Sequence, residues 1–228
     1  MNVLEIERLK KHYVAPDGTR ALVVDVPQFA CAAGEQTALA GTSGSGKTTL
    51  LNLIAGILRA DSGSVRIMGV DLESLPESRR DQLRGRHIGY IFQTFNLLQG
   101  YTALENVELA MMFGKGGGRD AAVHLLERVG LKDRLHYRPR QLSVGQQQRV
   151  AVARALANSP EIVLADEPTG NLDHRHAREA LALIRTVCRE ANAALVLVSH
   201  DREILGQFER VVELSEINRA AASSGVAA

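Results

Sequence analysis

Gly41-Thr42-Ser43-Gly44-Ser45-Gly46-Lys47-Thr48 fits the pattern G-x-x-x-x-G-K-[ST]. In this pattern the glycines let the backbone curl, so that successive N–H groups point at a single anion. A helix that begins near Lys47 would add the positive end of its dipole. We expect Lys47 to pair with the β- and γ-phosphates of a nucleotide and the Thr48 hydroxyl to coordinate Mg²⁺. The alternative is a plain glycine turn between a strand and a helix.

The sequence on both sides of this loop is typical of an α/β protein. Residues 36–40 are predicted to form a strand that leads into the loop, and residues 48–57 a buried helix. Apolar runs at 162–165 and 194–198 are separated by a helical pattern over about 176–189. Continuous apolar runs with helices between them predict a parallel sheet that is covered on both faces.

Periodicity predicts further strands and helices outside this core. Residues 4–7 and 65–68 alternate in polarity, and residues 21–26 are apolar and β-branched, so three more strands are expected. Asp17-Gly18 is a turn signal. The expected helices cover residues 78–86, 104–113, 120–129 and 146–157.

Composition excludes several classes of protein. The 228 residues are enough for one large domain with its own core. Lys and Arg number 27 against 26 Asp and Glu, so no global basic field exists to gather nucleic acid, and we expect no nucleic-acid partner. No run can span a bilayer, so any membrane role is expected to come through a partner protein. Cys31 and Cys188 fit no metal-binding pattern and are expected to be reduced core thiols.

An acidic pair, Asp166 and Glu167, closes the apolar run 162–165. Carboxylates at the carboxyl end of a buried parallel strand lie where open α/β sheets bind their ligands. Asp166 is expected to hold the magnesium shell, and Glu167 to polarise the water that attacks the γ-phosphate. Taken alone, such a pair is also typical of a solvated loop.

A second anion site is predicted at the start of the helix near residue 146. Ser143 is a natural N-cap, and Gly145 has no side chain to block an approaching anion. One nucleotide cannot easily use both helix ends within one chain, because they belong to separate parts of the fold. Two copies arranged head to tail could close both ends over a shared nucleotide.

With these motifs in this order, the chain strongly resembles the ATP-binding-cassette (ABC) ATPases over about residues 2–215. The resemblance implies an α/β P-loop NTPase fold with a mixed core sheet, an N-terminal antiparallel β-subdomain and an inserted helical subdomain at about 94–142. It implies a single domain over residues 1–218. The Ala/Ser/Gly-rich tail, residues 219–228, is expected to be disordered.

Each motif takes a family role within this resemblance. Residues 41–48 look like Walker A, Asp166 and Glu167 like Walker B with the catalytic glutamate, and residues 142–146 like the signature motif. The nucleotide-binding residues that the resemblance implies are Tyr13, Gly41, Thr42, Ser43, Gly44, Ser45, Gly46, Lys47, Thr48, Thr49, Ser143, Gly145, Gln146 and Asp173.

Apart from Thr49, which directly follows Walker A, four of the implied residues lie outside those three motifs. Gln93 looks like the Q-loop glutamine and could complete the magnesium shell, and His200 looks like the switch histidine that senses the γ-phosphate. Asp173 matches the D-loop, and Tyr13 the aromatic residue that stacks on adenine. The resemblance therefore implies catalytic roles for Glu167, His200, Lys47 and Gln93, and magnesium ligands Thr48, Gln93 and Asp166.

The resemblance also implies a role in transport. It is strongest to the branch that serves lipoprotein-releasing, macrolide-exporting and cell-division permeases. The implied protein hydrolyses ATP, forms a homodimer across the nucleotide, and powers an integral-membrane permease from the cytoplasmic face of the inner (plasma) membrane. One alternative is a nucleotide-gated scaffold on a permease-like partner, with turnover secondary. The other is a non-transport ABC protein of translation or DNA repair, but those proteins need two cassettes or a long coiled coil.

Three segments each allow two interpretations of their role. Phe95, Leu97 and Leu98 are a candidate permease contact within residues 94–113, or else simply subdomain core. Val144 stands where the family usually has a second glycine, and a β-branched residue resists positive φ. Either its backbone is ordinary and its side chain points away, or the signature contacts are weakened. The four arginines of residues 78–86 form either a solvated helix face or a membrane-surface contact.

Overall fold

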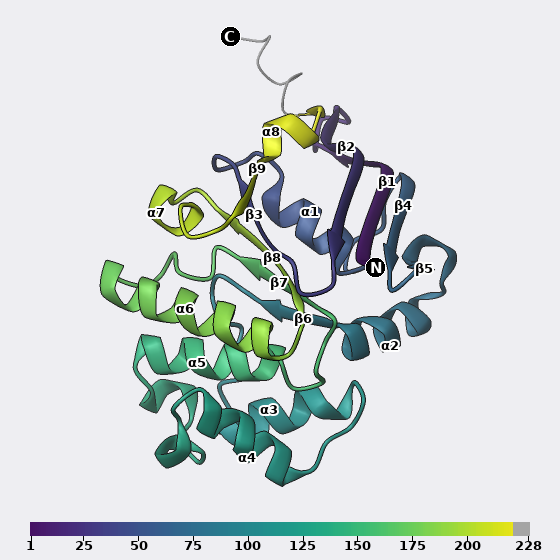
Figure 1. Cartoon of the computed structure of the whole chain (residues 1–228). Helices are drawn as coiled ribbons and strands as arrows, with labels where there is room; N and C mark the ends of the chain where they lie inside the picture. The colour runs from purple at the N-terminus through teal and green to yellow at the C-terminus, as the bar shows by residue number, and fades with distance from the viewer. Residues whose placement is uncertain (221–228) are drawn as a thin grey trace.

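A computed structural model describes residues 1–220, which fold into two sheets and the helices that cover them (Figure 1). The strands are β1 Asn2–Val14, β2 Arg20–Ala32, β3 Gln36–Ala40, β4 Ser62–Ile67, β5 Val70–Asp71, β6 Ile88–Ile91, β7 Ile162–Asp166, β8 Ala194–Ser199 and β9 Arg210–Glu213. The first sheet is antiparallel, with the order β2-β1-β4-β5. The second has the order β6-β7-β8-β3-β9, and each of its pairings is parallel.

The helices lie between and beside these sheets. They are α1 Lys47–Ile54, α2 Glu77–His87, α3 Ala103–Met112, α4 Arg119–Arg128, α5 Val144–Ala155, α6 His174–Glu190, α7 Arg202–Leu205 and α8 Leu214–Ile217, with short 3-10 turns η1 Leu72–Ser74, η2 Lys132–Arg134 and η3 Pro139–Gln141. In Figure 1, α1 lies between the two sheets, while α3, α4, α5 and α6 gather on the opposite side of the parallel sheet. Within the described residues, no helix combines the length and hydropathy of a bilayer span.

The fold confirms the expected class and refines one detail of it. The family resemblance implies a mixed core sheet, whereas the five-stranded sheet is parallel throughout, as its apolar runs predict, and the antiparallel pairings are confined to the other sheet. The reason is connectivity. Parallel neighbours need long crossover connections, which the helices supply, while β1 and β2 are joined by a hairpin and so pair antiparallel with each other.

Alternate residues of the parallel strands serve two different cores. Val163, Leu195 and Leu197 face the cluster formed with the helices α3–α6. Leu164 and Val196 face the cluster that joins α1 to the antiparallel sheet. A strand that is apolar on both sides is therefore required between the two cores, which explains why these runs show no polar alternation. Cys31 and Cys188 are both buried as free thiols, as expected.

Capping residues explain where the helices begin. Ser143 caps α5, because its hydroxyl accepts from the Gln146 N–H while the Gln146 side chain accepts from the Ser143 N–H. This capping box starts the helix at Val144, two residues before the predicted start. Thr102 and Glu105 form the same arrangement at the start of α3.

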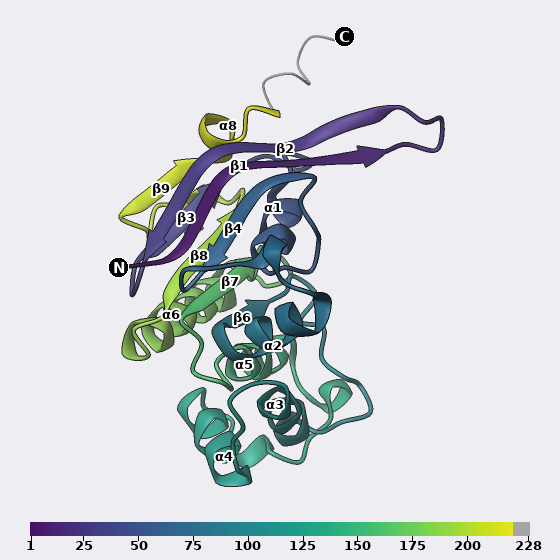
Figure 2. The same cartoon turned by 90° about the vertical axis from the view of Figure 1, so that its right-hand side faces the viewer.

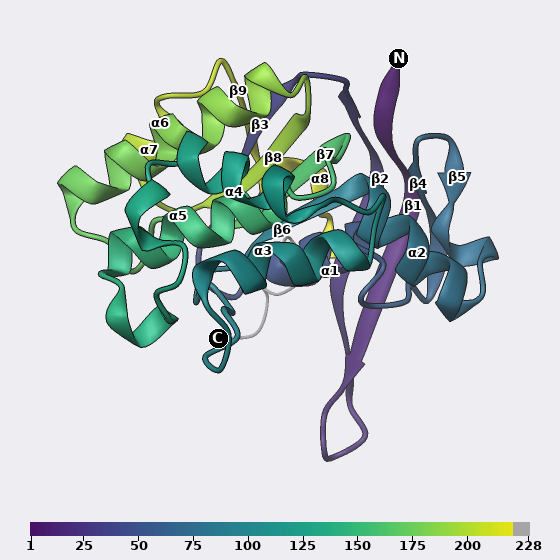
Figure 3. The same cartoon turned by 90° about the horizontal axis from the view of Figure 1, so that it is seen from below.

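The first two strands are much longer than their apolar cores predict. The pairing of β1 with β2 continues to its last pair, Val14 opposite Arg20, whereas β4 pairs with β1 only as far as Lys10. This outer hairpin therefore projects beyond the rest of the molecule (Figures 2 and 3). Because it buries neither face, its sequence lacks the alternation by which a strand is recognised.

The end of the described chain is anchored. The Arg219 N–H donates to the Asp25 carbonyl at 2.9 Å, and Ala220 is buried. These two residues belong to the folded domain, so the expected disorder is wrong for them. The rest of the expected tail, residues 221–228, lies outside the described residues.

Candidate active site

The glycine-rich loop joins β3 to α1 and depends on left-handed backbone. Gly44 has φ 80° and Gly46 has φ 91°, and Gly46 is also the N-cap of α1. A Cβ atom on Gly46 would lie 2.9 Å from the carbonyl oxygen of Val23, so any side chain here would collide with β2. Glycine is therefore required at this position, where the loop leads into the N-terminal end of α1.

Lys47 is buried at the base of this loop. Its ammonium group donates to the carbonyl oxygens of Gly41, at 2.6 Å, and Thr42, at 3.0 Å. It also lies 3.3 Å from Oε1 of Glu167. The loop carbonyls thus hold the positive charge where the glycine-rich loop of residues 41–48, the phosphate loop, meets the acidic end of β7 at Asp166 and Glu167.

Asp166 and Glu167 lie at the carboxyl end of β7, as the sequence predicts, and both are buried. Burial raises the pKa of Asp166, and the negative charge of Glu167 raises it further, while a hydrogen bond with the Thr48 side chain and the charge of Lys47 oppose the rise. A cation bound beside Asp166 would favour its ionised form.

Glu167 is held on several sides. Its N–H donates to the Val198 carbonyl at 3.1 Å, and its φ of 44° is left-handed. The Ser199 hydroxyl donates to Oε2 at 3.2 Å, and Nδ1 of His200 lies 2.7 Å from Oε1. With Lys47 near the same oxygen, the carboxylate is fixed in direction, which a base that orients a water molecule requires.

These groups surround one cavity of about 340 Å³, within the usual range for small-molecule sites. It is lined by Val23, Ser43, Gly44, Gly46, Lys47, Thr48, Thr49, Gln93, Glu167 and His200. The structure therefore brings the phosphate loop, the acidic strand end, Gln93 and His200 together. Val23 lines the cavity in addition, and Ser199 supports it from behind through its hydrogen bond to Glu167. Neither is predicted from the sequence, because an apolar strand residue and a serine carry no pattern of their own.

The oxygen donors fit magnesium only in the presence of phosphate. Thr48, Asp166 and Gln93 offer a hydroxyl, a carboxylate and an amide. Within residues 1–220, no group of three or more His, Cys, Asp or Glu side chains could hold a metal ion without a ligand. Mg²⁺ is commonly bound by one or two carboxylates and completed by water and substrate phosphates, and the donors here match that arrangement.

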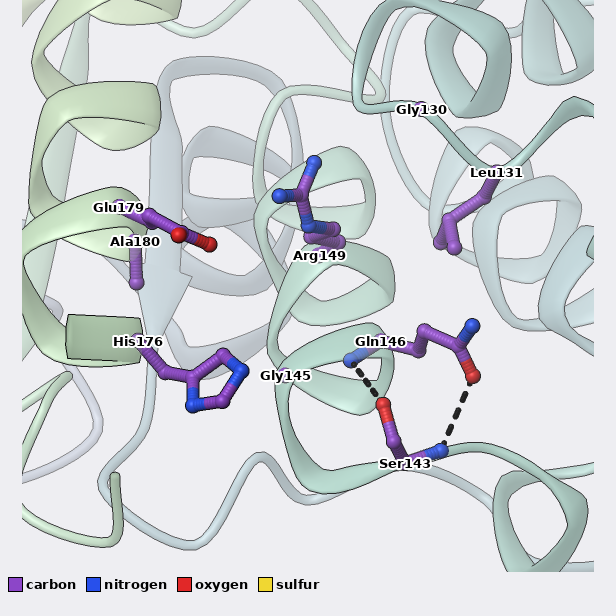
Figure 4. A pocket seen from close by; sticks show the side chains of 9 residues that line it. All are labelled: Gly130, Leu131, Ser143, Gly145, Gln146, Arg149, His176, Glu179 and Ala180. Atoms are coloured by element: carbon purple, nitrogen blue, oxygen red, sulfur yellow. Dashed lines mark hydrogen bonds between the residues drawn. The ribbon is translucent and has the colours of Figure 1, made fainter. Parts of the chain in front are cut away.

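The remaining predicted residues lie elsewhere. Ser143, Gly145 and Gln146 line a separate cavity of about 340 Å³ (Figure 4). Tyr13 lies on the projecting hairpin, 43% exposed and outside the lining of the phosphate-loop cavity. Asp173 is exposed and caps α6. The phosphate-loop cavity and the cavity at the start of α5 are thus lined by different residues of the chain.

The structure decides between the two alternatives for the segment after Gln93. Phe95 and Leu97 are buried in the core that the helices share, so the subdomain-core alternative holds for both, and of the three only Leu98 is exposed. The segment is tied to the loop before α6, because the Asn171 side chain donates to the Gln93 carbonyl at 2.7 Å. Arg154 also donates to the Phe95 carbonyl, at 2.7 Å.

The structure also bears on the two other open alternatives. Val144 is the first residue of α5 and is 47% exposed, so its backbone is an ordinary helical one and its side chain is partly in solvent. The arginine-rich run is helix α2 and is mostly exposed, but Arg80 is buried and Arg84 donates to the Gly56 carbonyl at the end of α1. At least these two arginines have a structural role.

Comparison with known proteins agrees with this geometry. A family model described as "ABC transporter" matches residues 24–170. The lipoprotein-releasing system ATP-binding protein LolD of Anaeromyxobacter dehalogenans is 46% identical over 215 residues, which cover 92% of this chain and 90% of that protein. The macrolide export ATP-binding/permease protein MacB of Photorhabdus laumondii is 38% identical over 94% of this chain but only 33% of its own length. The dimeric ATP-binding cassette MJ0796 bound to ADP and Pi superposes with a TM-score of 0.83 at 34% identity, over 92% of this chain and 93% of that chain.

Proposed function

The chain belongs to the ABC transporter family of ATPases, and on that premise we propose that two copies enclose and hydrolyse ATP to drive an integral-membrane permease. The observation that carries the proposal is that the phosphate-loop cavity and the cavity at the start of α5, here called the two half-sites, are separate. The phosphate-loop cavity holds Lys47 and Glu167, while Ser143 and Gly145 line another cavity. A second copy can bring its Ser143 and Gly145 to the nucleotide that the first copy binds.

The proposed chemistry is mainly electrostatic. The N–H groups of the glycine-rich loop and the buried ammonium group of Lys47 meet the negative charge that spreads over the transferring phosphoryl group. Mg²⁺, when bound, neutralises charge on the β- and γ-phosphates, and Thr48, Asp166 and Gln93 are the residues to hold it. Glu167 orients the attacking water, and His200 lies beside its carboxylate in reach of the same region.

The permease contact is proposed on the surface beside α3. After Phe95 and Leu97 are assigned to the core, exposed apolar side chains remain at both ends of this helix: Leu98 and Tyr101 before it, Met112 as its last residue and Phe113 directly after it. Phe113 also lines a cavity of about 420 Å³ along the edge strand β6, together with Tyr90 and Ala110. Asp81, Arg84, Arg154 and Asn158 line the cavity as well, so it offers both apolar and polar contacts. A short amphipathic helix from a permease loop fits such a cavity.

This cavity is physically connected to the nucleotide site. Tyr90 lines it and stacks on Phe92, with ring centroids 4.2 Å apart, and Phe92 precedes Gln93. The Tyr90 hydroxyl also donates to the side chain of Asn52 on α1, the helix that begins at the phosphate loop. Movement of a permease helix in the cavity would therefore reach both Gln93 and α1.

We further propose that the permease is of the export or extraction type that the lipoprotein-releasing and macrolide-export relatives represent. The chain would then lie at the cytoplasmic face of the plasma membrane, held there by its permease.

The test compares ATP hydrolysis with and without the permease that copurifies with the chain. We expect measurable basal turnover, stimulation by the reconstituted permease, and a loss of about 100-fold or more in both conditions for Glu167→Gln. Glu216→Gln changes an exposed carboxylate on α8 and serves as the matched control. Normal turnover by Glu167→Gln would refute the catalytic assignment. Turnover that is indifferent to the permease would favour a nucleotide-gated scaffold.

A further inference from the structure

The half-site at α5 has an open face at Gly145. The Ser143 hydroxyl and the Gln146 side chain are already engaged in the capping box, drawn as dashed lines in Figure 4. A Cβ atom built on Gly145 would meet a single neighbour within 4 Å among the described residues, Cδ2 of His176 at 3.7 Å. The ring of His176, on α6, therefore forms the wall beside the glycine that a second copy must approach.

The other edge of the same ring is bound to Asp173. His176 Nδ1 lies 2.6 Å from Oδ2 of Asp173, and the His176 N–H donates to Oδ1 at 3.0 Å. The hydrogen bond from the His176 N–H has the larger effect and the one from the ring the smaller, and both lower the pKa of Asp173. Its carboxylate is therefore ionised near neutral pH. Because an ionised carboxylate only accepts hydrogen bonds, Nδ1 must carry the proton that is donated.

The two other charged side chains in this cavity, Arg149 and Glu179, are paired with other groups and do not bind Asp173. Arg149 lines the same cavity, but it donates to the Val129 carbonyl at 2.9 Å. Glu179, one turn further along α6, is paired with Arg175 at 3.2 Å. Among the described side chains that line this cavity, His176 is the one that binds Asp173 and whose ring a Cβ atom on Gly145 would meet.

We propose that His176 is a positioning residue: its ring forms the wall beside Gly145 and its Nδ1 holds Asp173, so that the surface that a second copy meets is fixed in advance. The inference rests on the proposed ATP-dependent dimer. Surfaces that are ordered before association lose less conformational freedom on binding, so the expected effect is on dimer affinity. Both side chains are more than half exposed, and their loss should hardly change the stability of the single chain.

The test measures the dimer dissociation constant by sedimentation velocity at saturating MgATP, in a Glu167→Gln background that blocks turnover. Adding His176→Ala should weaken the dimer about tenfold. Adding His176→Asn should restore most of the affinity, because the asparagine amide nitrogen takes the place of Nδ1. His174→Ala is the matched control, since His174 is two residues away on the same helix and its side chain is 89% exposed.

A second measurement separates positioning from damage to the fold. The affinity of each variant for a fluorescent ATP analogue, measured at concentrations where the chain is monomeric, should equal that of the Glu167→Gln parent. Equal dimer affinity in parent and His176→Ala would overturn the inference and leave the proposed function intact. An equal loss in His174→Ala, no rescue by asparagine, or a parallel loss of ATP affinity would overturn it as well. A parent that does not dimerise at all would overturn both.

Discussion

Glu167 combines an unusual backbone with a crowded carboxylate. Its φ of 44° is rare for a residue with a Cβ atom, and Lys47, Ser199 and His200 all contact its side chain. Backbone strain of this kind costs on the order of 1–3 kcal/mol and persists where the surrounding structure enforces it, commonly at active sites. At Glu167 the strain aims the carboxylate into the phosphate-loop cavity.

Val144→Gly tests the departure from the family motif. We expect ATP turnover to stay within a few-fold of the parent, because the backbone of Val144 is already helical and its side chain is half exposed. Steady-state turnover, measured beside Gly145→Ala, is the readout. Gly145→Ala should reduce turnover, because its methyl group would occupy the open face beside His176. A large gain in Val144→Gly would mean that valine impairs the half-site.

Single residues differ in how far the sequence predicts them. Of the residues that line the phosphate-loop cavity, Lys47 and Glu167 are predicted from the residue pattern itself, whereas Gln93 and His200 follow only from the family resemblance. Ser199 and His176 escape prediction, because a serine or histidine becomes informative only when the residues it contacts are known. Phe95 and Leu97 show the reverse limit, since an apolar cluster in sequence does not reveal whether it is exposed or buried.

At the scale of elements, the projecting hairpin is held at its base by Asp61. The carboxylate accepts from the His12 N–H at 2.6 Å and lies 3.3 Å from the Lys11 ammonium group. Chiefly because of the hydrogen bond from the His12 backbone, the pKa of Asp61 is lowered to about 2. Asp61 thus fixes the strand that carries Tyr13, the residue that the family resemblance places on adenine.

Asp61→Asn should destabilise the protein in a pH-dependent way. A carboxylate whose pKa is lowered on folding contributes stability above its unfolded pKa, and the contribution is lost as the pH falls through the folded value. After allowance for solvent screening, we expect the variant to lose about 1 kcal/mol at pH 7. The deficit should shrink as the pH falls from about 4 towards 2.

Urea unfolding at a series of pH values measures this difference. Asp133→Asn, at an exposed position in η2, is the control and should show no comparable deficit. A deficit in Asp61→Asn that stays constant below pH 4 would contradict the assignment of Asp61.

The elements themselves were predictable where they are amphipathic or doubly buried. The apolar runs of β7 and β8 predict strands within one residue of their ends. The outer halves of β1 and β2 are not predicted, because paired strands without a buried face carry no periodic signal. The parallel core sheet is predicted by apolar runs with helices between them, whereas the family resemblance implies a mixed sheet.

At the scale of the whole molecule, the two half-sites belong to different layers of the fold. The phosphate loop follows β3, in the centre of the parallel sheet, whereas Ser143 and Gly145 begin α5, among the helices on one side of it. Each half-site is preformed. The phosphate loop has Gly46 in a left-handed conformation, and the start of α5 has the capping box of Ser143 and Gln146. We therefore predict that a single chain can bind ATP, but that two chains are needed to complete the catalytic arrangement.

The mass of the Glu167→Gln chain in solution, measured by light scattering with and without saturating MgATP, tests this claim most directly. The account predicts a monomer without nucleotide and a doubling of mass with MgATP, reversed when the nucleotide is removed. A Glu167→Gln chain that binds ATP yet remains monomeric, both alone and beside its permease, would contradict it.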